Sequence, residues 1–282
     1  MNLKVFFTTR AAVPMIDPDD EPLRVALEER GVEVQPAVWT DPNVDWSAAD
    51  LCLIRSTWDY HRHLQEFIAW AERVDAVTRL WNGLDLVRWN TDKHYLRDLE
   101  QAGVPAVTTV WLPRGEPADF SAILEEHGWD EVVIKPTVSA DSFGTMRLDR
   151  ATAREAQIRL DTLLRIDDIM LQPFLAPVVE RGERSLIFIA EELTHALRRG
   201  DVFGRMQRAQ ELIEPTPEEV ALARRALAEV TRPYLYARVD LISPADEPPI
   251  LMELELVEPS LFLPLAPQAA ERLAERIMEI IG

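Results

Sequence analysis

The stretch ILMELELVEPSLFL, residues 250–263, has the apolar composition of a buried strand, but Glu253 and Glu255 interrupt it. In a strand, residues i and i+2 point to the same face, so these two carboxylates lie side by side. Like charges placed in this way repel each other, and burying either one without a partner is costly. The pair therefore lies on a solvated face, or it belongs to a site that binds cations.

The preceding segment YARVDLIS, residues 236–243, predicts an antiparallel hairpin with this stretch. A register that pairs Asp240 with Glu253 places Arg238 opposite Glu255, so that three carboxylates converge beside one guanidinium group. Oxygen ligands are what Mg²⁺ prefers, especially where a nucleotide supplies further oxygens. The alternative interpretation is the solvent face of an amphipathic strand, which the alternation by itself also supports.

Lysine is scarce in this chain, which has 27 Arg but only 3 Lys, at Lys4, Lys93 and Lys135. A lysine is a compact charge on a flexible stem and suits one phosphate oxygen in a narrow pocket, whereas arginine is a broad planar fork. Lysine is therefore expected where arginine cannot replace it. Chance is the alternative explanation, because three positions are few.

Composition sets the broad class of the protein. The chain has 282 residues, 47% of them hydrophobic and 28% charged, as in a soluble globular protein with more than one domain. The net charge of −19 argues against a nucleic-acid-binding surface. We find neither an apolar run long enough for a membrane span nor a secretory signal, and the single cysteine, Cys52, is typical of a reducing environment. We therefore expect a cytoplasmic protein that acts away from membranes.

Three regions of different organisation follow one another. Strands and helices alternate through the first ninety residues, which predicts a layered α/β domain with a largely parallel sheet. A helix capped by Asn90 or Thr91 and ended by Gly103 leads into a compact α+β unit. The final third combines further strands with two helices, the first of which opens with a capping box at residues 216–219.

The loop RSTWDYH, residues 55–61, follows the carboxyl end of a predicted strand, where open α/β sheets usually bind ligands. In one interpretation Arg55 binds a substrate carboxylate, while Thr57, Asp59 and Tyr60 orient an amino group. In the other, Trp58 and Tyr60 simply anchor the loop on the core.

These residues together resemble the ATP-grasp ligases, and within them the glutathione-synthetase-like group that includes D-cycloserine-forming cyclo-ligases. The resemblance rests on the acidic hairpin, the two lysines and four segments that span the chain: RSTWDY, VIKPTVSADSFGT, GERSLIFIAEELTHALRR and MELELVEPSLFL. It implies an α/β (α+β) ATP-grasp fold of three domains. These are an N-terminal Rossmann-like pre-ATP-grasp (substrate) domain at residues 1–90, a small central lid domain at 91–174 and a C-terminal ATP-grasp domain at 175–282.

The resemblance also implies roles for individual residues. Lys93 and Lys135 resemble the lysines that bind ATP phosphates, and Arg238 resembles the catalytic arginine that steadies the transferred phosphoryl group and the tetrahedral intermediate. The magnesium ligands would be Asp240, Glu253 and Glu255. The remaining ATP contacts would be Ser139, Ser142 and Gly144 in the phosphate-covering loop, Gln172, Pro173, Phe174 and Leu175 in an adenine-reading hinge, Glu183 at the ribose and Met252 against the adenine ring. The substrate contacts would be Arg55, Thr57, Trp58, Asp59 and Tyr60.

Three departures from the common family pattern stand out. Asp141 adds a negative charge to the phosphate loop, which is richer in glycine in many relatives. The metal pair is Glu-x-Glu, whereas Glu-x-Asn is common. The segment at residues 198–211 has no lysine, so a third cationic contact would come from Arg199, Arg205 or Arg208.

We therefore expect an ATP- and Mg²⁺-dependent ligase that activates a small carboxylate as an acyl phosphate for attack by an amine nitrogen, with release of ADP and phosphate. Ring closure within one substrate and joining of two substrates both fit the pattern. The expected partners are an amino-acid-like small molecule, no nucleic acid and no membrane, with a homodimer as a candidate assembly. One alternative is a non-catalytic nucleotide-binding protein, which Asp141 favours. Another, a plain α/β structural protein, leaves the acidic hairpin unexplained.

Overall fold

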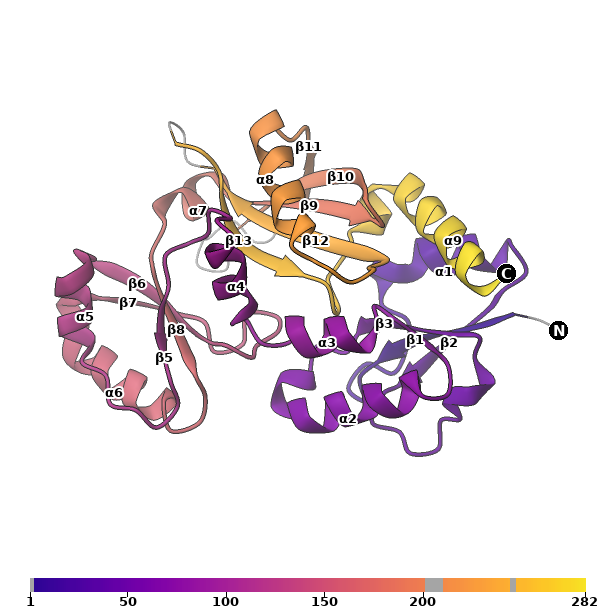
Figure 1. The fold of residues 1–282 in the computed structure, drawn as a ribbon, viewed down its shortest axis with the longest axis horizontal. Coiled ribbons are helices and arrows are strands. Elements are labelled where there is room, and N and C mark those ends of the chain that lie inside the picture. The colour runs from indigo at the N-terminus through magenta and orange to yellow at the C-terminus, as the bar shows by residue number, and fades with distance from the viewer. Residues whose placement is uncertain (1–2, 201–209, 244–246) are drawn as a thin grey trace.

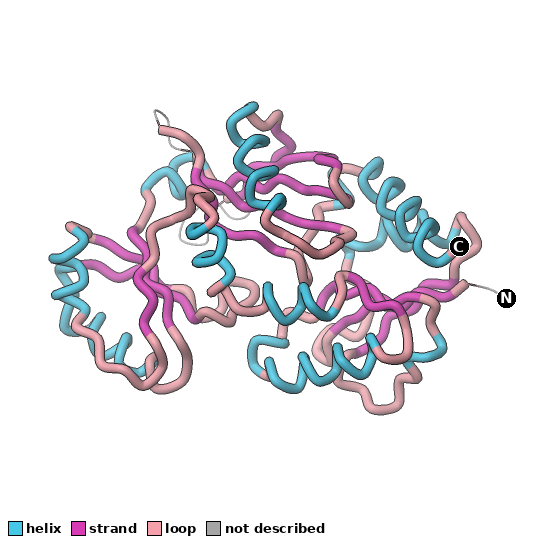
Figure 2. Tube along the Cα trace, in the orientation of Figure 1, coloured by secondary structure: helices cyan, strands magenta, loops and turns pink. Residues whose placement is uncertain are grey.

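The computed structural model describes residues 3–200, 210–243 and 247–282. Within these residues the chain forms a mixed α/β fold with three separate sheets (Figure 1). Helices lie against each sheet, and Figure 2 shows how they alternate with the strands along the chain. No helix of the described residues is long and apolar enough to cross a membrane.

The N-terminal sheet is parallel throughout, as the alternation of strands and helices predicts, with the order β2-β1-β3-β4. Its central strands are buried on both faces because helices cover both. Helix α2 lies on one face, where Phe67 and Trp70 pack against Cys52 and Ile54. The elements are β1 (Lys4–Thr9), α1 (Glu21–Glu28), β2 (Glu33–Val38), β3 (Leu51–Ser56), α2 (Leu64–Asp75), β4 (Arg79–Trp81) and α3 (Leu84–Asn90).

The central sheet is antiparallel, with the order β5-β8-β6-β7. Strand β6 alternates between buried and half-buried residues, and its buried side chains Val132 and Ile134 pack with Phe120 and Leu160 of the two helices on that face. The other face is left for the site described below. The elements are β5 (Val110–Leu112), α5 (Phe120–His127), β6 (Glu131–Pro136), β7 (Met146–Asp149), α6 (Ala153–Leu163) and β8 (Ile169–Pro173).

The C-terminal sheet is also antiparallel, with the order β11-β10-β9-β12-β13. Its α8 helix begins at the predicted capping box. In this box the side chain of Thr216 accepts a hydrogen bond from the Glu219 amide, and the side chain of Glu219 accepts one from the Thr216 amide. The elements are α7 (Ala176–Arg181), β9 (Glu183–Ile189), β10 (Glu192–Arg199), β11 (Gln210–Ile213), α8 (Pro217–Ala228), β12 (Tyr236–Ile242), β13 (Ile250–Glu255) and α9 (Pro267–Ile281).

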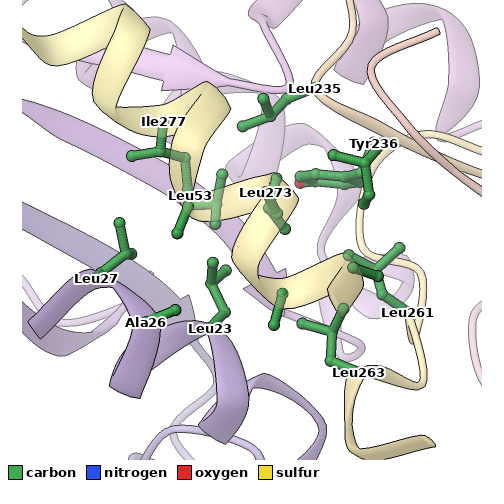
Figure 3. Close-up of a cluster of buried hydrophobic side chains, with 14 of the residues drawn as sticks. Leu23, Ala26, Leu27, Leu53, Leu235, Tyr236, Leu261, Leu263, Leu273 and Ile277 are labelled. Carbon is green, nitrogen blue, oxygen red and sulfur yellow. The ribbon is translucent and has the colours of Figure 1, made fainter. Parts of the chain in front are cut away.

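Helix α9 joins the N-terminal and C-terminal sheets. Its Leu273 and Ile277 are fully buried between Leu27 of α1 and Tyr236 of β12 (Figure 3). The hydroxyl of Tyr236 continues this connection, because it donates to the carbonyls of Ile54 and Val257. Each large side chain buried in this way contributes about 1.5–3 kcal/mol. The two sheets are therefore held together by one shared apolar core.

The register of the acidic hairpin is the predicted one. Asp240 pairs with Glu253 and Arg238 pairs with Glu255, after which the register shifts between Asp240 and Leu241. The prediction succeeded because the alternation of side chains along a strand is a local property.

Strand β13 lies at the edge of its sheet, so its outer backbone groups need partners from elsewhere. The Asn90 side chain donates to the carbonyl of Leu254 and accepts from the amide of Leu256, and the Tyr95 hydroxyl accepts from the amide of Leu254. The prediction of a helix capped by Asn90 or Thr91 is therefore wrong at its start. Asn90 instead ends α3, and the next helix, α4 (Tyr95–Gln101), begins five residues later without a side-chain cap.

Candidate active site

A cleft of about 680 Å³ lies where the central and C-terminal sheets approach the loop after β3. It brings together residues that are far apart in the sequence. The predicted site residues that line it are Trp58, Tyr60, Lys93, Lys135, Ser139, Ser142, Gln172, Pro173, Phe174, Leu175, Glu183, Arg238, Asp240, Met252, Glu253 and Glu255.

Lys93 is buried where the loop after β6 approaches strand β13. Its ammonium group donates to the carbonyl of Ser139 at 2.7 Å and pairs with Glu253 Oε1 at 3.1 Å. Burial alone raises the pKa of a carboxyl group, but Lys93 and then Lys135 hold the pKa of Glu253 below its ordinary value. Glu253 is therefore ionised in a site that already contains two positive charges.

Lys135 comes from β6 and faces the same cleft from the opposite side. Burial lowers its pKa, and the negative charge of Glu253 opposes that shift. Among the described residues its side chain has neither a hydrogen bond nor an ion pair. Its charge is thus open to an anion that enters the cleft.

Arg238 holds the carboxylates of the hairpin. Its guanidinium binds Asp240 at 3.1 Å, Glu255, and the carbonyl of Ser260 at 3.3 Å. Burial raises the pKa of Glu255 to about 7. The negative charge of Glu253 adds to this shift, and Arg238 opposes it. Glu255 is therefore harder to ionise than an exposed glutamate.

Asp240 is the most enclosed carboxylate of the hairpin. Besides Arg238, it accepts from Ser185 Oγ at 2.6 Å and from Arg199 at 2.8 Å. Arg199 also pairs with Glu183 at 2.6 Å, so the expected ribose acceptor is engaged by this arginine. The two other candidates for a third cationic contact, Arg205 and Arg208, lie outside the described residues.

The three predicted metal ligands differ in their fit to Mg²⁺. The side chains of Glu253 and Glu255 are 25% and 26% exposed, and both present oxygens to the cleft. The side chain of Asp240 is only 4% exposed, and both its oxygens are bonded to arginine. Within the described ranges no three acidic, His or Cys side chains are grouped to hold a metal ion. Glu253 and Glu255 thus have the oxygen chemistry that Mg²⁺ prefers and are open to the cleft although each is paired with one cation, whereas Asp240 is enclosed by two arginines.

The predicted phosphate loop lies between β6 and β7 and borders the cleft. Asp141, Ser142 and Gly144 have φ values of 49°, 58° and 74°, all in the left-handed region. Aspartate tolerates this region better than most residues, so the loop makes its tight turn with fewer glycines than usual. Gly144 does not line the cleft, but a Cβ there would lie 2.9 Å from Pro136.

The tip of this loop reaches the N-terminal domain. The Phe143 ring lies 4.6 Å from the His61 ring and below the Arg62 guanidinium, which is 5.5 Å away. Ala140 is buried in the apolar cluster around α2. The loop therefore covers the cleft by contacts with the segment that follows β3.

The predicted hinge forms the end of β8 and the turn into α7. Gln172 and Pro173 are paired with β6, and the Gln172 amide donates to Thr109 at 2.8 Å. The amide of Phe174 donates to the carbonyl of Glu131. Met252 of β13 also lines the cleft, so the hinge and this apolar side chain face the same space.

The structure does not bring Arg55, Thr57 and Asp59 to the cleft. Arg55 is 3% exposed, binds Asp20 at 2.7 Å, and donates to the carbonyl of Pro259 at 3.1 Å. Asp59 accepts from the Trp39 indole, and Thr57 is fully buried. The expected pairing of Arg55 with a substrate carboxylate is therefore corrected. A buried guanidinium needs an acid beside it, and Asp20 already supplies that acid.

Residues that the sequence interpretation missed also line the cleft. The polar and charged ones include Arg10 after β1, Asn90, Tyr95, and Glu258 and Ser260 after β13. The segment Glu258-Pro259-Ser260 follows the carboxyl end of the acidic strand. Its polar residues at that end of the strand were the sequence signal that could have identified Glu258 and Ser260 as part of the site.

Known proteins match this chain in sequence and in fold. Residues 5–82 match the family model of the N-terminal domain of D-cycloserine synthetase DcsG. The cycloserine biosynthesis protein DcsG of Streptomyces lavendulae is 33% identical in an alignment of 304 positions. The alignment covers 99% of this chain and 99% of that protein. The crystal structure of D-cycloserine synthetase DcsG superposes with a TM-score of 0.89 at 31% identity, over 99% of this chain and 100% of that chain.

More distant structures share the fold alone. The D-alanine–D-alanine ligase from Bacillus anthracis, solved with ATP, has a TM-score of 0.72 at 15% identity and covers 99% of this chain and 97% of its own. An ATP-grasp protein from Sphaerobacter thermophilus has a TM-score of 0.73 at 18% identity, over 96% of this chain and 98% of its own.

Proposed function

The chain belongs to the D-cycloserine synthetase family of ATP-grasp ligases, and we propose that it closes a ring within one small amino-acid-like substrate. Family membership makes it an ATP-dependent, ADP-forming carbon–nitrogen ligase. D-cycloserine contains an amide between its carboxyl carbon and its ring nitrogen. The substrate class is therefore a D-amino acid whose side chain ends in a nitrogen nucleophile, such as β-aminooxy-D-alanine, the product of opening that amide.

The reaction has two steps. A carboxylate oxygen of the substrate attacks the γ-phosphorus of ATP, the bond to the β-phosphate oxygen breaks, and ADP leaves. The terminal nitrogen then attacks the carbonyl carbon of the acyl phosphate. Phosphate leaves with the former carboxylate oxygen, the nitrogen loses a proton, and the ring amide forms. This chemistry requires positioning and charge stabilisation from the protein, without a covalent enzyme intermediate.

The proposed roles follow from the arrangement of charges. Lys93 and Lys135 approach the cleft from different elements and would bind phosphate oxygens. Arg238 would stabilise the charge that develops on the transferred phosphoryl group and on the tetrahedral carbon. Glu253 and Glu255, with Asp240 once it is released by an arginine, would hold Mg²⁺, which neutralises phosphate charge when it is bound. Adenosine would lie against the hinge and Met252, and its ribose near Glu183.

One observation carries the proposal: Lys93, Lys135, Arg238, Glu253 and Glu255 line a single cleft, although they come from three regions of the chain. A site for the terminal phosphates of a nucleotide needs this combination of cations and metal-binding oxygens. An adenylating enzyme would instead need its charges at the α-phosphate.

The test is to incubate the protein with ATP, Mg²⁺ and β-aminooxy-D-alanine and to identify the products. We expect D-cycloserine, ADP and phosphate in equal amounts, and ¹⁸O from the substrate carboxylate in the released phosphate. Formation of AMP, or of unlabelled phosphate during product formation, contradicts the mechanism. A requirement for a second amine contradicts ring closure and indicates ligation between two substrates. Replacing the exposed Glu126 by Gln on α5 is the matched control and should change nothing.

A further inference from the structure

Glu258 stands out among the carboxylates of the cleft because its side chain has no partner in the described part of the chain. It is 9% exposed and lines the cleft just beyond the end of β13. Glu183, Asp240, Glu253 and Glu255 each pair with a lysine or arginine. Among the described residues, the Glu258 side chain has neither a hydrogen bond nor an ion pair. Burying a carboxylate without a hydrogen-bond partner costs free energy of folding. An unpartnered glutamate in this position therefore points to a ligand that supplies the partner.

The backbone that carries Glu258 is held at four consecutive carbonyls. Each accepts a hydrogen bond from a side chain of another segment. The donors and distances are Tyr236 Oη to Val257 at 3.0 Å, Trp58 Nε1 to Glu258 at 3.0 Å, Arg55 to Pro259 at 3.1 Å and Arg238 to Ser260 at 3.3 Å. The Asp19 carboxylate fixes the next two amides, those of Leu261 and Phe262. Glu258 is therefore pre-organised, and little ordering is needed when a ligand binds.

Within the described residues, the cations that act on Glu258 are engaged elsewhere. The two that act on it electrostatically are Lys93 and Arg238, and both are bonded to other groups. Burial, and then the neighbouring Glu255, raises the pKa of Glu258 to about 8. A positive charge placed beside it would reverse both effects.

The groups around Glu258 favour an organic cation. Trp58, Tyr60 and Phe262 line the cleft together with Glu258 and add aromatic surface to it, and Arg10 lies 4.8 Å above the Trp58 ring. The Trp58 indole donates to the Glu258 carbonyl at 3.0 Å, so this ring lies beside Glu258, and after burial the charge of Glu258 contributes most to raising the pKa of Tyr60. A small ammonium group has three donors and no acceptor, and it suits one carboxylate with an aromatic surround.

We propose that Glu258 binds the α-ammonium group of the substrate, and that Arg55 and Trp58 act as positioning residues by holding its backbone. This inference rests on the proposed function for the nature of the substrate. It also gives the RSTWDY segment a role without direct substrate contact by Arg55: Arg55 and Trp58 hold the backbone that carries Glu258. Binding at the α-ammonium would orient the amino acid and select against carboxylates that lack an amino group.

The test measures binding and does not depend on turnover. Two probes are titrated by calorimetry with a non-hydrolysable ATP analogue and Mg²⁺ present: β-aminooxy-D-alanine and β-aminooxypropionate, which lacks the α-amino group. In the parent protein we expect the amino-bearing probe to bind at least about tenfold more tightly, as a charge-assisted hydrogen bond requires. Glu258→Gln should abolish most of this preference and leave the affinity for β-aminooxypropionate unchanged. Glu258→Asp should retain part of it.

The outcomes separate this inference from the proposed function. A parent protein that binds both probes equally overturns the ammonium site, whatever its turnover. An equal loss of affinity for both probes in Glu258→Gln also overturns the ammonium site, because a general disturbance of the cleft then explains the weaker binding. Clear discrimination by Glu258 without formation of D-cycloserine supports the ammonium site and contradicts only the ring closure. Glu126→Gln is the control, and thermal melting should show that Glu258→Gln folds at least as stably as the parent.

Discussion

Lys93 Nζ lies 3.1 Å from Glu253 Oε1, so a proposed phosphate-binding cation and a proposed metal ligand are paired with each other before any nucleotide arrives. The same is true of Arg238 and Glu255. Such pairing offsets the cost of burying separate charges. Binding of a nucleotide with Mg²⁺ would exchange these internal pairs for pairs with phosphate and metal, so a substitution at one partner also affects the other.

Lys135→Arg should weaken the binding of a non-hydrolysable ATP analogue by about tenfold, because a wide guanidinium cannot replace a compact charge at one phosphate oxygen. Lys4→Arg is the matched control. Lys4 pairs with the exposed Glu33 at 3.5 Å on the surface, far from the cleft lining. Equal affinity of the parent and both variants, measured by calorimetry, would remove the argument from lysine scarcity.

Glu253→Gln and Glu255→Gln should each raise the Mg²⁺ concentration required for half-maximal ADP release, because each removes a charged oxygen ligand. Their effects on stability should differ. Glu253→Gln leaves the buried Lys93 without its acid, whereas Glu255→Gln leaves Arg238 paired with Asp240. Thermal melting checks this difference. Normal Mg²⁺ dependence together with strong destabilisation in both variants would assign the pair a structural role.

Gly144→Ala should raise the KM for ATP, whereas Gly115→Ala should not. Both glycines have left-handed φ values, +74° and +79°, so both variants incur about 1–2 kcal/mol of backbone strain. Only at Gly144 does the added Cβ also meet a neighbour, Pro136, at 2.9 Å. Steady-state kinetics of the two variants therefore distinguish displacement of the phosphate loop from general strain. The same KM in both would mean that the loop does not contact the nucleotide.

Stability should fall as the pH rises from about 5 to about 8 when no ligand is bound. The pKa of Glu258 is raised from 4.5 to about 8 and that of Glu255 to about 7. In this window the folded protein holds protons that the unfolded chain has released, so raising the pH favours unfolding. Glu258→Gln should flatten the upper part of the profile, measured as the melting temperature against pH. An unchanged slope would show that Glu258 is ionised in the folded protein throughout.

Part of the fold could be predicted because it depends on neighbours in the sequence. The hairpin register follows from the two-residue repeat of side chains along β12 and β13, which the structure confirms. The capping box of α8 likewise lies within four consecutive residues. The start of α4 could not be predicted in this way, because Asn90 is used to satisfy the edge of β13 and no local signal reveals that partner.

The sequence by itself determined the residue types of the site, because strand periodicity and the choice of lysine over arginine are local properties, and its motifs resemble those of the ATP-grasp ligases. Only the tertiary structure decided what those residues touch. Arg55 is turned away from the cleft by Asp20, which lies 35 positions earlier in the chain, and it supports the carbonyl of Pro259, which lies 204 positions later. Glu258 has no side-chain partner among the described residues, because Lys93 and Arg238 are already bound to other groups. Such pairings depend on which distant segments the core brings together, and a linear pattern does not contain that information.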